Sequence, residues 1–267
     1  MLNTGELVLL ISLDGKRYLR PLNPGVTFHT QDGKLDMGQV AAAGFGACVR
    51  THKGTPYRIL QPTLADLIKG VKRSTTIMYP KEIGYLLLKL GVGPGRRIVE
   101  AGSGSGGLTV GLAWMVGDTG RVYTCEKRQE FYELAGKNLE SVGLAHRVSR
   151  YHMDIADGFP EEAKGAQALF LDVRNPWDYL EQAAAVVAPG SPVGFLLPTV
   201  NQIVDLLRAM ETSSFDDVEI LEILHRRYKP VPDRLRPEDR MVAHTGFLVF
   251  ARHRGLPPEP WEPDQAV

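Results

Sequence analysis

A glycine-rich segment and the acidic residue before it have the clearest chemical meaning in this sequence. Residues 98–107 read Ile-Val-Glu-Ala-Gly-Ser-Gly-Ser-Gly-Gly. Glycine lacks a Cβ, so its backbone can approach a ligand more closely than that of other residues. An apolar helical pattern resumes at 108–116, so the segment joins a buried strand to the start of a helix. In α/β proteins such a junction binds nucleotide cofactors.

The glycine spacing alone fits two kinds of cofactor. Gly102, Gly104 and Gly107 match the dinucleotide pattern, and Glu126 follows where that pattern places a ribose-binding acid. Glu100, however, precedes the first glycine. A carboxylate there suits the cationic amino-acid end of S-adenosylmethionine, whereas it would repel a pyrophosphate. Glu100 therefore favours S-adenosylmethionine over a dinucleotide.

Three further acids end the strands that follow. Glu126 closes Tyr-Thr-Cys-Glu, Asp154 closes His-Met-Asp, and Asp172 follows Phe-Leu. Ligands of a parallel sheet bind at the carboxyl ends of its strands, so with Glu100 these acids should line one site. Glu126 fits an acceptor for two ribose hydroxyls, and Asp154 fits an acceptor for an adenine amino group.

Alternating strand and helix patterns position these acids. We predict strands at 97–100, 122–126, 148–153, 168–172 and 193–197, with helices between them at 106–116, 128–142, 176–187 and 201–212. A late pair of segments follows at about 216–227 and 243–252. This order predicts a Rossmann-like α/β fold, with a doubly wound, mostly parallel seven-stranded sheet closed by an antiparallel end strand.

The first 60 or so residues have a different pattern. Short apolar runs and tight turns such as Asp14-Gly15, without helical periodicity, predict a small β domain. The apolar run 7–13 lacks a basic leader, so we interpret it as a strand rather than a signal peptide. Thr63 is predicted to cap a helix, and another helix begins at 79–81. We therefore divide the chain into a small β domain at 1–62, a catalytic domain at 63–254 and a Pro-rich tail at 255–267 that we predict to be disordered.

Composition narrows the function classes. Lys plus Arg and Asp plus Glu both total 31 in 267 residues, which argues against a free-standing polycationic nucleic-acid binder but allows local patches. Cys48 and Cys125 lie far apart without metal-ligand spacing, as in a cytosolic protein. No segment is long enough to span a membrane, so we predict a cytoplasmic location.

These motifs resemble known families. The glycine segment with its four acids resembles class I S-adenosylmethionine-dependent methyltransferases. Three stretches, at 50–54, 72–81 and 171–177, resemble the narrower family of tRNA (adenine-N1)-methyltransferases that modify adenine 58 of the T-loop. The first reads Arg-Thr-His-Lys-Gly, the second Lys-Arg-Ser-Thr-Thr-Ile-Met-Tyr-Pro-Lys, and the third Leu-Asp-Val-Arg-Asn-Pro-Trp. His-Thr-Gly-Phe-Leu at 244–248 resembles the family's final strand, so the likeness covers roughly residues 1–254.

The resemblance implies roles for individual residues. Asp172 takes the position of the catalytic aspartate, and Tyr79 that of a tyrosine beside the methyl donor. Phe131 stands where some members carry a polar residue, which puts a peripheral cofactor contact in question. The resemblance also implies a homotetramer that binds tRNA across subunits and uses no metal. S-adenosylmethionine, released as S-adenosylhomocysteine, would contact Glu100, Gly102, Gly104, Ser105, Gly106, Gly107, Leu108, Glu126, Asp154, Ile155 and Asp172.

The RNA-binding surface is less clearly marked. Lys72-Arg73 and six cations at 225–240 fall near the expected mouth of the sheet, but Asp233, Glu238 and Asp239 interleave with the latter. The stretch therefore fits either phosphate binding or a solvated charged loop.

Other functions stay open at this point. A class I methyltransferase acting on a protein or small molecule would share the cofactor half of the site. A non-catalytic tRNA-binding subunit should have lost the glycine segment or Asp172, and this chain keeps both. Titration with S-adenosylhomocysteine against NAD would identify a dehydrogenase.

Overall fold

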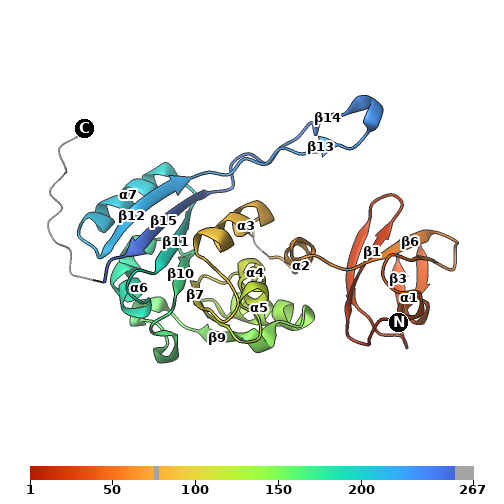
Figure 1. Cartoon of the computed structure of the whole chain (residues 1–267), viewed down its shortest axis with the longest axis horizontal. Helices are drawn as coiled ribbons and strands as arrows, with labels where there is room; N and C mark the ends of the chain where they lie inside the picture. Colours follow the sequence, from red (N-terminus) through yellow and green to blue (C-terminus); the bar gives the residue numbers. More distant parts are fainter. Residues whose placement is uncertain (75–77, 256–267) are drawn as a thin grey trace.

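The computed structural model describes residues 1–74 and 78–255 (Figure 1). Its larger part is built on a seven-stranded sheet of order β12-β15-β11-β10-β7-β8-β9. Neighbours from β9 to β11 are parallel, while β15 runs antiparallel to both β11 and β12. The predicted fold and its antiparallel closure are thus confirmed. The strands are β7 (Arg97–Ala101), β8 (Arg121–Glu126), β9 (Val148–His152), β10 (Ala168–Leu171), β11 (Pro192–Leu197), β12 (Phe215–Leu221) and β15 (Phe247–His253).

Helices cover both faces of this sheet. Along β7, Ile98 packs into one apolar cluster and Val99 into the other, as the two-residue period of a strand requires. Burial on both faces explains why the central strands are apolar throughout rather than alternating. The helices are α2 (Leu64–Gly70), α3 (Pro80–Lys89), α4 (Gly107–Val116) and α5 (Gln129–Ser141) on the first face, and α6 (Leu180–Val186) and α7 (Val200–Glu211) on the second.

Local signals start the helices near the glycine segment. Thr63 caps α2, where its hydroxyl accepts from the N–H of Asp66 and the Asp66 carboxylate binds the N–H of Thr63 in return. Pro80 occupies the first turn of α3, directly after Tyr79. Helix α4 is apolar on nearly all sides and is buried between the sheet and helices α2 and α3.

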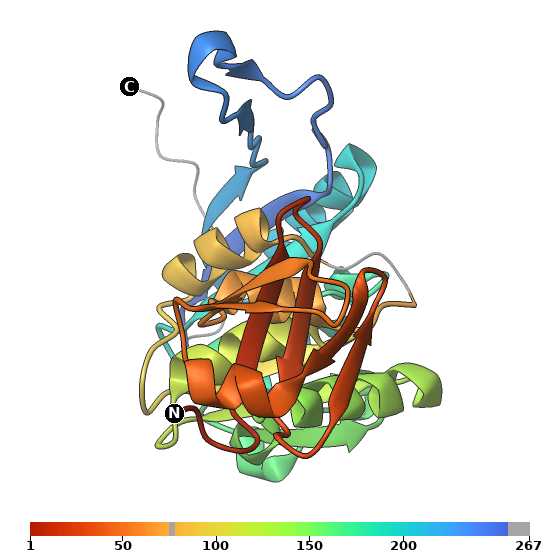
Figure 2. The same cartoon turned by 90° about the vertical axis from the view of Figure 1, so that its right-hand side faces the viewer.

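The N-terminal β region has an apolar cluster of its own, around Leu10, Tyr57 and Ile59. Strands β1 (Leu7–Ser12), β2 (Arg17–Pro21), β5 (Cys48–Arg50) and β6 (Pro56–Leu60) form an antiparallel sheet of order β2-β1-β6-β5, and β3 (Thr27–Thr30) pairs with β4 (Gly33–Asp36). Figure 2 shows this region in front of the larger sheet.

The structure corrects the N-terminal prediction in one respect. A helix, α1 (Met37–Ala43), begins after Asp36, whose side chain accepts from the N–H of Gly38. Seven residues make fewer than two turns, which is too short for a periodic apolar pattern to be visible. The division of the chain at residue 62 stays a prediction, and all but the first residue of the predicted tail lies outside the described residues.

Between β12 and β15 the chain leaves the sheet and forms a projection, residues 222–246, which we call the arm (Figure 1). It contains the short strands β13 (Tyr228–Lys229) and β14 (Arg236–Pro237). The strands predicted at 216–227 and 243–252 are therefore too long on the arm side, because the pairing of β12 with β15 ends at Leu221 and Leu248. Across residues 1–74 and 78–255, no helix is long and apolar enough to cross a membrane.

Candidate functional site

A cavity of about 580 Å³ opens at the carboxyl ends of the central strands. Five residues predicted for cofactor binding line it, from the ends of β7, β8 and β10 and from the turn after β9: Gly102, Glu126, Asp154, Ile155 and Asp172. The topology thus brings the strand-end acids together as expected, with the exception of Glu100. The volume lies within the range typical of small-molecule sites.

Glu126 is fixed at the end of β8 by the backbone around it. One carboxylate oxygen accepts from the N–H of Gly104 at 2.9 Å, and the other accepts from the N–H of Arg128 at 3.0 Å. The Arg128 guanidinium lies 3.9 Å from the centre of the Phe131 ring. Phe131, where a polar residue was expected, is therefore buried beneath an arginine at the rim of the cavity. Sequence reasoning missed Arg128, although it stands only two residues after a strand-end acid.

The glycine segment is constrained by its own backbone and by β10. Gly102, Gly104 and Gly106 all have positive φ, where other residues are strained. A Cβ on Gly102 would lie 2.1 Å from the backbone oxygen of Asp172. The rest of the segment, Ser105 to Leu108, is buried and is not among the described residues that line the cavity. Its predicted cofactor contacts therefore stay predictions.

Asn138 of α5 anchors the glycine segment, and sequence reasoning missed it. Its side chain is buried, accepts from the N–H of Lys72 at 3.0 Å, and donates to the backbone oxygens of Lys72 (2.9 Å) and Ser105 (2.8 Å). The residues before α3 are thereby tied to the glycine segment. A lone Asn within a helical pattern gave no signal of this role.

Glu100 is not among the described residues that line the cavity, and its direct contact with a cationic ligand stays a prediction. The carboxylate is 1% exposed, and one oxygen accepts from the hydroxyls of Thr109 and Thr124, each at 2.7 Å. Burial, together with the charges of Asp172 and Glu126, raises its pKa to about 7, although the two hydrogen bonds lower it. Glu100 of β7 therefore links its strand to α4 through Thr109 and to β8 through Thr124.

Asp172 is exposed to the cavity but enclosed by its walls. This desolvation, together with the charge of Glu126, raises its pKa to about 6, although Arg128 lowers it. The N–H of Asp172 donates to the backbone oxygen of Ala101 at 2.9 Å. Within the described part of the chain its carboxylate has no hydrogen-bond donor. Asp172 therefore offers a free acceptor to whatever enters the cavity.

Asp154, which also lines the cavity, already has an ion-pair and a hydrogen-bond partner. Lys127 lies 2.5 Å from one carboxylate oxygen, and the N–H of Ala156 donates to the other at 3.1 Å. Mainly through the Lys127 contact, its pKa is lowered, so it is a carboxylate at neutral pH. Each oxygen keeps a further lone pair for a ligand.

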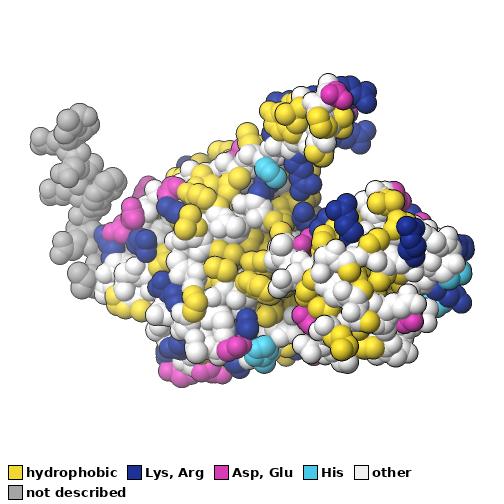
Figure 3. All heavy atoms as spheres, turned by 45° about the vertical axis from the view of Figure 1, so that its right-hand side comes forward, with side chains coloured by type: hydrophobic (Ala, Val, Ile, Leu, Met, Phe, Trp, Pro, Cys, Tyr) yellow, Lys and Arg dark blue, Asp and Glu magenta, His cyan; other side chains and the backbone are white. Residues whose placement is uncertain are grey.

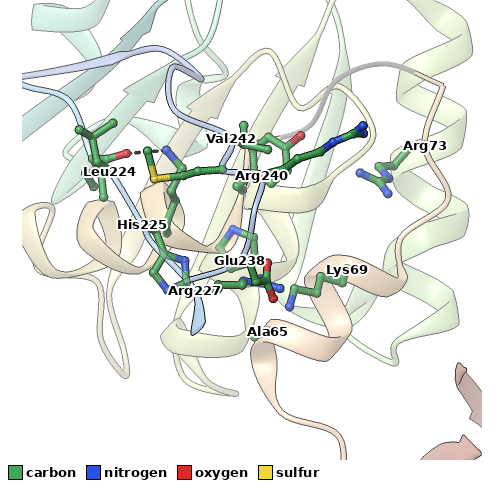
Figure 4. A pocket seen from close by; sticks show the side chains of 14 residues that line it. Ala65, Lys69, Arg73, Leu224, His225, Arg227, Glu238, Arg240 and Val242 are labelled. Atoms are coloured by element: carbon green, nitrogen blue, oxygen red, sulfur yellow. Dashed lines mark hydrogen bonds between the residues drawn. The ribbon is translucent and has the colours of Figure 1, made fainter. Parts of the chain in front are cut away.

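Tyr79 lies in a different cavity. It lines a second hollow of about 760 Å³ between α2, the start of α3 and the arm (Figure 4). Asn138 ties Lys72 to the glycine segment, whereas Tyr79 lines this hollow, and residues 75–77 lie outside the described residues. The structure therefore does not bring Tyr79 and Asp172 into one cavity.

Comparison with known proteins agrees with this geometry. Residues 57–235 match a family model described as the tRNA methyltransferase complex GCD14 subunit. The tRNA (adenine(58)-N(1))-methyltransferase TrmI of Thermus thermophilus is 34% identical, over 92% of this chain and 96% of its own. The tRNA (adenine(57)-N(1)/adenine(58)-N(1))-methyltransferase TrmI of Methanocaldococcus jannaschii is 31% identical, over 96% and 97% respectively.

Solved structures give the same fold. The tRNA (m1A58) methyltransferase TrmI from Aquifex aeolicus has a TM-score of 0.78 and 40% identity, covering 94% of this chain and 98% of its own. A structure from Thermotoga maritima described as a SAM-dependent O-methyltransferase has a TM-score of 0.87 and 40% identity, covering 97% and 96%.

Proposed function

Because this chain belongs to the GCD14 family of tRNA methyltransferases, we propose that it transfers a methyl group from S-adenosylmethionine to N1 of adenine 58 in tRNA. The relatives from Thermus thermophilus and Methanocaldococcus jannaschii, which both carry adenine 58 in their names and align over nearly the whole chain, support the acceptor. The free carboxylate of Asp172 in the strand-end cavity is the observation that carries the chemistry.

The cavity fits S-adenosylmethionine better than a dinucleotide. Three acids line the cavity together with three cations: Glu126, Asp154 and Asp172, and Lys127, Arg128 and Arg174. Glu126 is paired with Arg128 and Asp154 with Lys127, whereas Asp172 is in no ion pair within the described residues. The unpaired carboxylate of Asp172 suits a ligand with a sulfonium and an ammonium group better than one with a pyrophosphate. Glu126 would hold two ribose hydroxyls of the cofactor, and Asp154 would accept from its adenine amino group. When bound, this cofactor supplies the methyl group as an electrophile.

Asp172 acts on the acceptor base. Neutral adenine N1 is a usable nucleophile, so the protein must position it in line with the methyl group and accommodate the positive charge that arises. Positioning contributes several kcal/mol to such reactions. The Asp172 carboxylate accepts a hydrogen bond from the adenine N6 amine, stabilises the cationic base as N1 is alkylated, and takes the N6 proton. Because N1 lies on the Watson–Crick edge, the base must leave its tRNA contacts to reach Asp172.

Site mapping tests this proposal directly. The protein is incubated with labelled S-adenosylmethionine and unmodified tRNA transcripts, and the methylated nucleoside is identified and located. We expect 1-methyladenosine at position 58, and no label in a transcript with guanosine at that position. The same map shows whether adenine 57 is also modified. Methyl transfer to protein but never to tRNA would overturn the assignment.

The Thermotoga maritima neighbour favours a second candidate, a methyltransferase acting on a hydroxyl group. The cofactor half of the site is equally suited to it. In the mapping experiment an O-methylated product identifies this alternative. The homotetramer, the binding of tRNA across subunits and the cytoplasmic location stay predictions, and sedimentation of the purified protein tests the first.

A further inference from the structure

The second cavity is cationic, and the mechanism above does not use its charges. Lys69 of α2, Arg73, and Arg227 and Arg240 of the arm line this volume of about 760 Å³. Glu238 is the single carboxylate among its described lining residues. Lys81 also lines it but is paired with Glu82 at 2.6 Å. The cavity therefore carries an excess of about three positive charges.

These cations are available to a ligand. Elsewhere on the arm, Lys229 and Arg236 are paired with Asp239. Within residues 1–74 and 78–255, Lys69, Arg73, Arg227 and Arg240 form no such ion pair. Figure 3 shows Lys and Arg side chains gathered in the notch between the arm and the N-terminal β region. Like charges held together without counter-charges cost free energy unless an anion binds.

The charges are spread along the cavity. Figure 4 shows Arg73 and Arg240 reaching toward one end of it, while Lys69 and Arg227 lie at the other end with Glu238. Apolar side chains of Leu224 and Val242 also line the cavity. Four cations supplied by α2, Arg73 and the arm suit several phosphates joined by sugars better than a single phosphate.

One side of this cavity lies close to the glycine segment. Asn138 binds both the backbone of Lys72 and the backbone oxygen of Ser105 in the glycine segment. Arg73 immediately follows the anchored residue. Arg73 therefore places one cation of this cavity beside a residue that is anchored to the glycine segment.

We propose that this cavity binds the phosphate backbone of the RNA strand beside the target base. The proposal rests on the proposed function, since it requires the acceptor base to lie at Asp172. Arginine suits this task because its planar guanidinium binds phosphate through two N–H groups. Contacts of this kind fix the register of the nucleic acid without reading its sequence.

The test compares two double variants with the same change of charge on the same element. Arg227→Gln with Arg240→Gln removes two cations that line the cavity. Arg226→Gln with Arg234→Gln removes two arm cations that do not line it. Binding of unmodified tRNA is measured by filter retention across a salt series, and kcat, the KM for tRNA and the Kd for S-adenosylmethionine are determined for each protein.

We expect the cavity variant to raise the tRNA KM about tenfold or more and to lower the slope of log K against log salt by about 1.4, or about 0.7 for each arginine–phosphate pair removed. Its Kd for the cofactor should stay within twofold, and the control should change the tRNA KM less than threefold. An unchanged KM in the cavity variant would overturn the proposal, as would equal losses in both variants, which indicate a long-range field rather than a site.

Sedimentation, site mapping and the wild-type salt slope separate the remaining explanations. Sedimentation shows whether the cavity variant keeps the assembly size of the wild type; a smaller assembly assigns the cavity to a contact between subunits and overturns the proposal. Wild-type protein that binds tRNA with the expected salt slope but methylates a different position contradicts the proposed function and leaves the phosphate site standing. A wild-type salt slope near zero overturns the phosphate site alone.

Discussion

Replacing Asp172 by Asn should remove most of the turnover while leaving cofactor binding intact. The amide keeps the size of the side chain but neither carries the charge that stabilises the alkylated base nor takes its proton. Loss of a positioned acid–base group costs about 10²- to 10⁴-fold in rate, which corresponds to about 3–5 kcal/mol in the activation free energy.

The pKa of Asp172 adds a second, independent signature. Desolvation and Glu126 raise it to about 6, and the active form is the carboxylate, so activity falls as the pH drops through this value. With a pKa near 6, the ionised fraction falls about tenfold between pH 7.5 and pH 5. We expect kcat/KM of the wild type to follow that fall, because this ratio reports ionisations of the free enzyme. The residual activity of Asp172→Asn should show no such break.

The assay is the initial rate of transfer of tritiated methyl groups to unmodified tRNA, from pH 5 to 8.5 at constant ionic strength. Asp154→Asn is the matched control, since Asp154 lies in the same cavity but its pKa is lowered by Lys127. That variant should raise the KM for S-adenosylmethionine and keep the break near pH 6. Near-wild-type kcat in Asp172→Asn, or a break near pH 6 that persists in it, refutes the assigned role.

Three further predictions concern the groups around the cavity. Glu100→Gln should raise the free energy of unfolding above that of the wild type, and this gain should be larger at pH 8 than at pH 5 by up to about 3 kcal/mol. The pKa of Glu100 is about 7 in the folded state and an ordinary 4.5 in the unfolded state, so the wild type loses stability as the pH rises from 4.5 to 7. Identical pH dependence of thermal unfolding in the two proteins would contradict this prediction. Asn138→Ala should lower the free energy of unfolding by about 3 kcal/mol, because three backbone groups lose their partner, and a loss below 1 kcal/mol in urea titration contradicts this. Tyr79→Ala should raise the tRNA KM at least fivefold if its ring stacks on a base, while Tyr79→Phe stays within threefold of wild type; equal KM values in the two variants exclude stacking.

The sheet was predictable because burial on both faces makes its central strands continuous apolar runs. β7, β8, β10 and β11 begin and end within one residue of the predicted ranges. The strand-end acids were predictable for the same reason, since parallel strands present their carboxyl ends at one edge. The helix α1 and the arm were not, because one is too short to show a period and the other is set by where β12 and β15 cease to pair.

The orientation of individual side chains was also beyond sequence reasoning. Glu100 occupies the position expected of a ligand-binding acid, yet its carboxylate accepts from Thr109 and Thr124. Asn138 contributes three hydrogen bonds to backbone groups, and such bonds depend on where distant segments meet. Arg128 is positioned at the rim by two contacts: its N–H donates to Glu126, and its guanidinium packs on the Phe131 ring.

Gly102 and Gly104 show why the glycine segment bears on the acceptor as well as on the cofactor. The sequence pattern indicates only that a ligand approaches this backbone. In the structure, the missing Cβ of Gly102 leaves room for the backbone oxygen of Asp172, and the N–H of Gly104 holds Glu126. The segment therefore sets the separation between the carboxylate assigned to the ribose and the carboxylate assigned to the acceptor base. Since catalysis by positioning depends on that separation to within about an ångström, the glycines are required even where they touch no ligand.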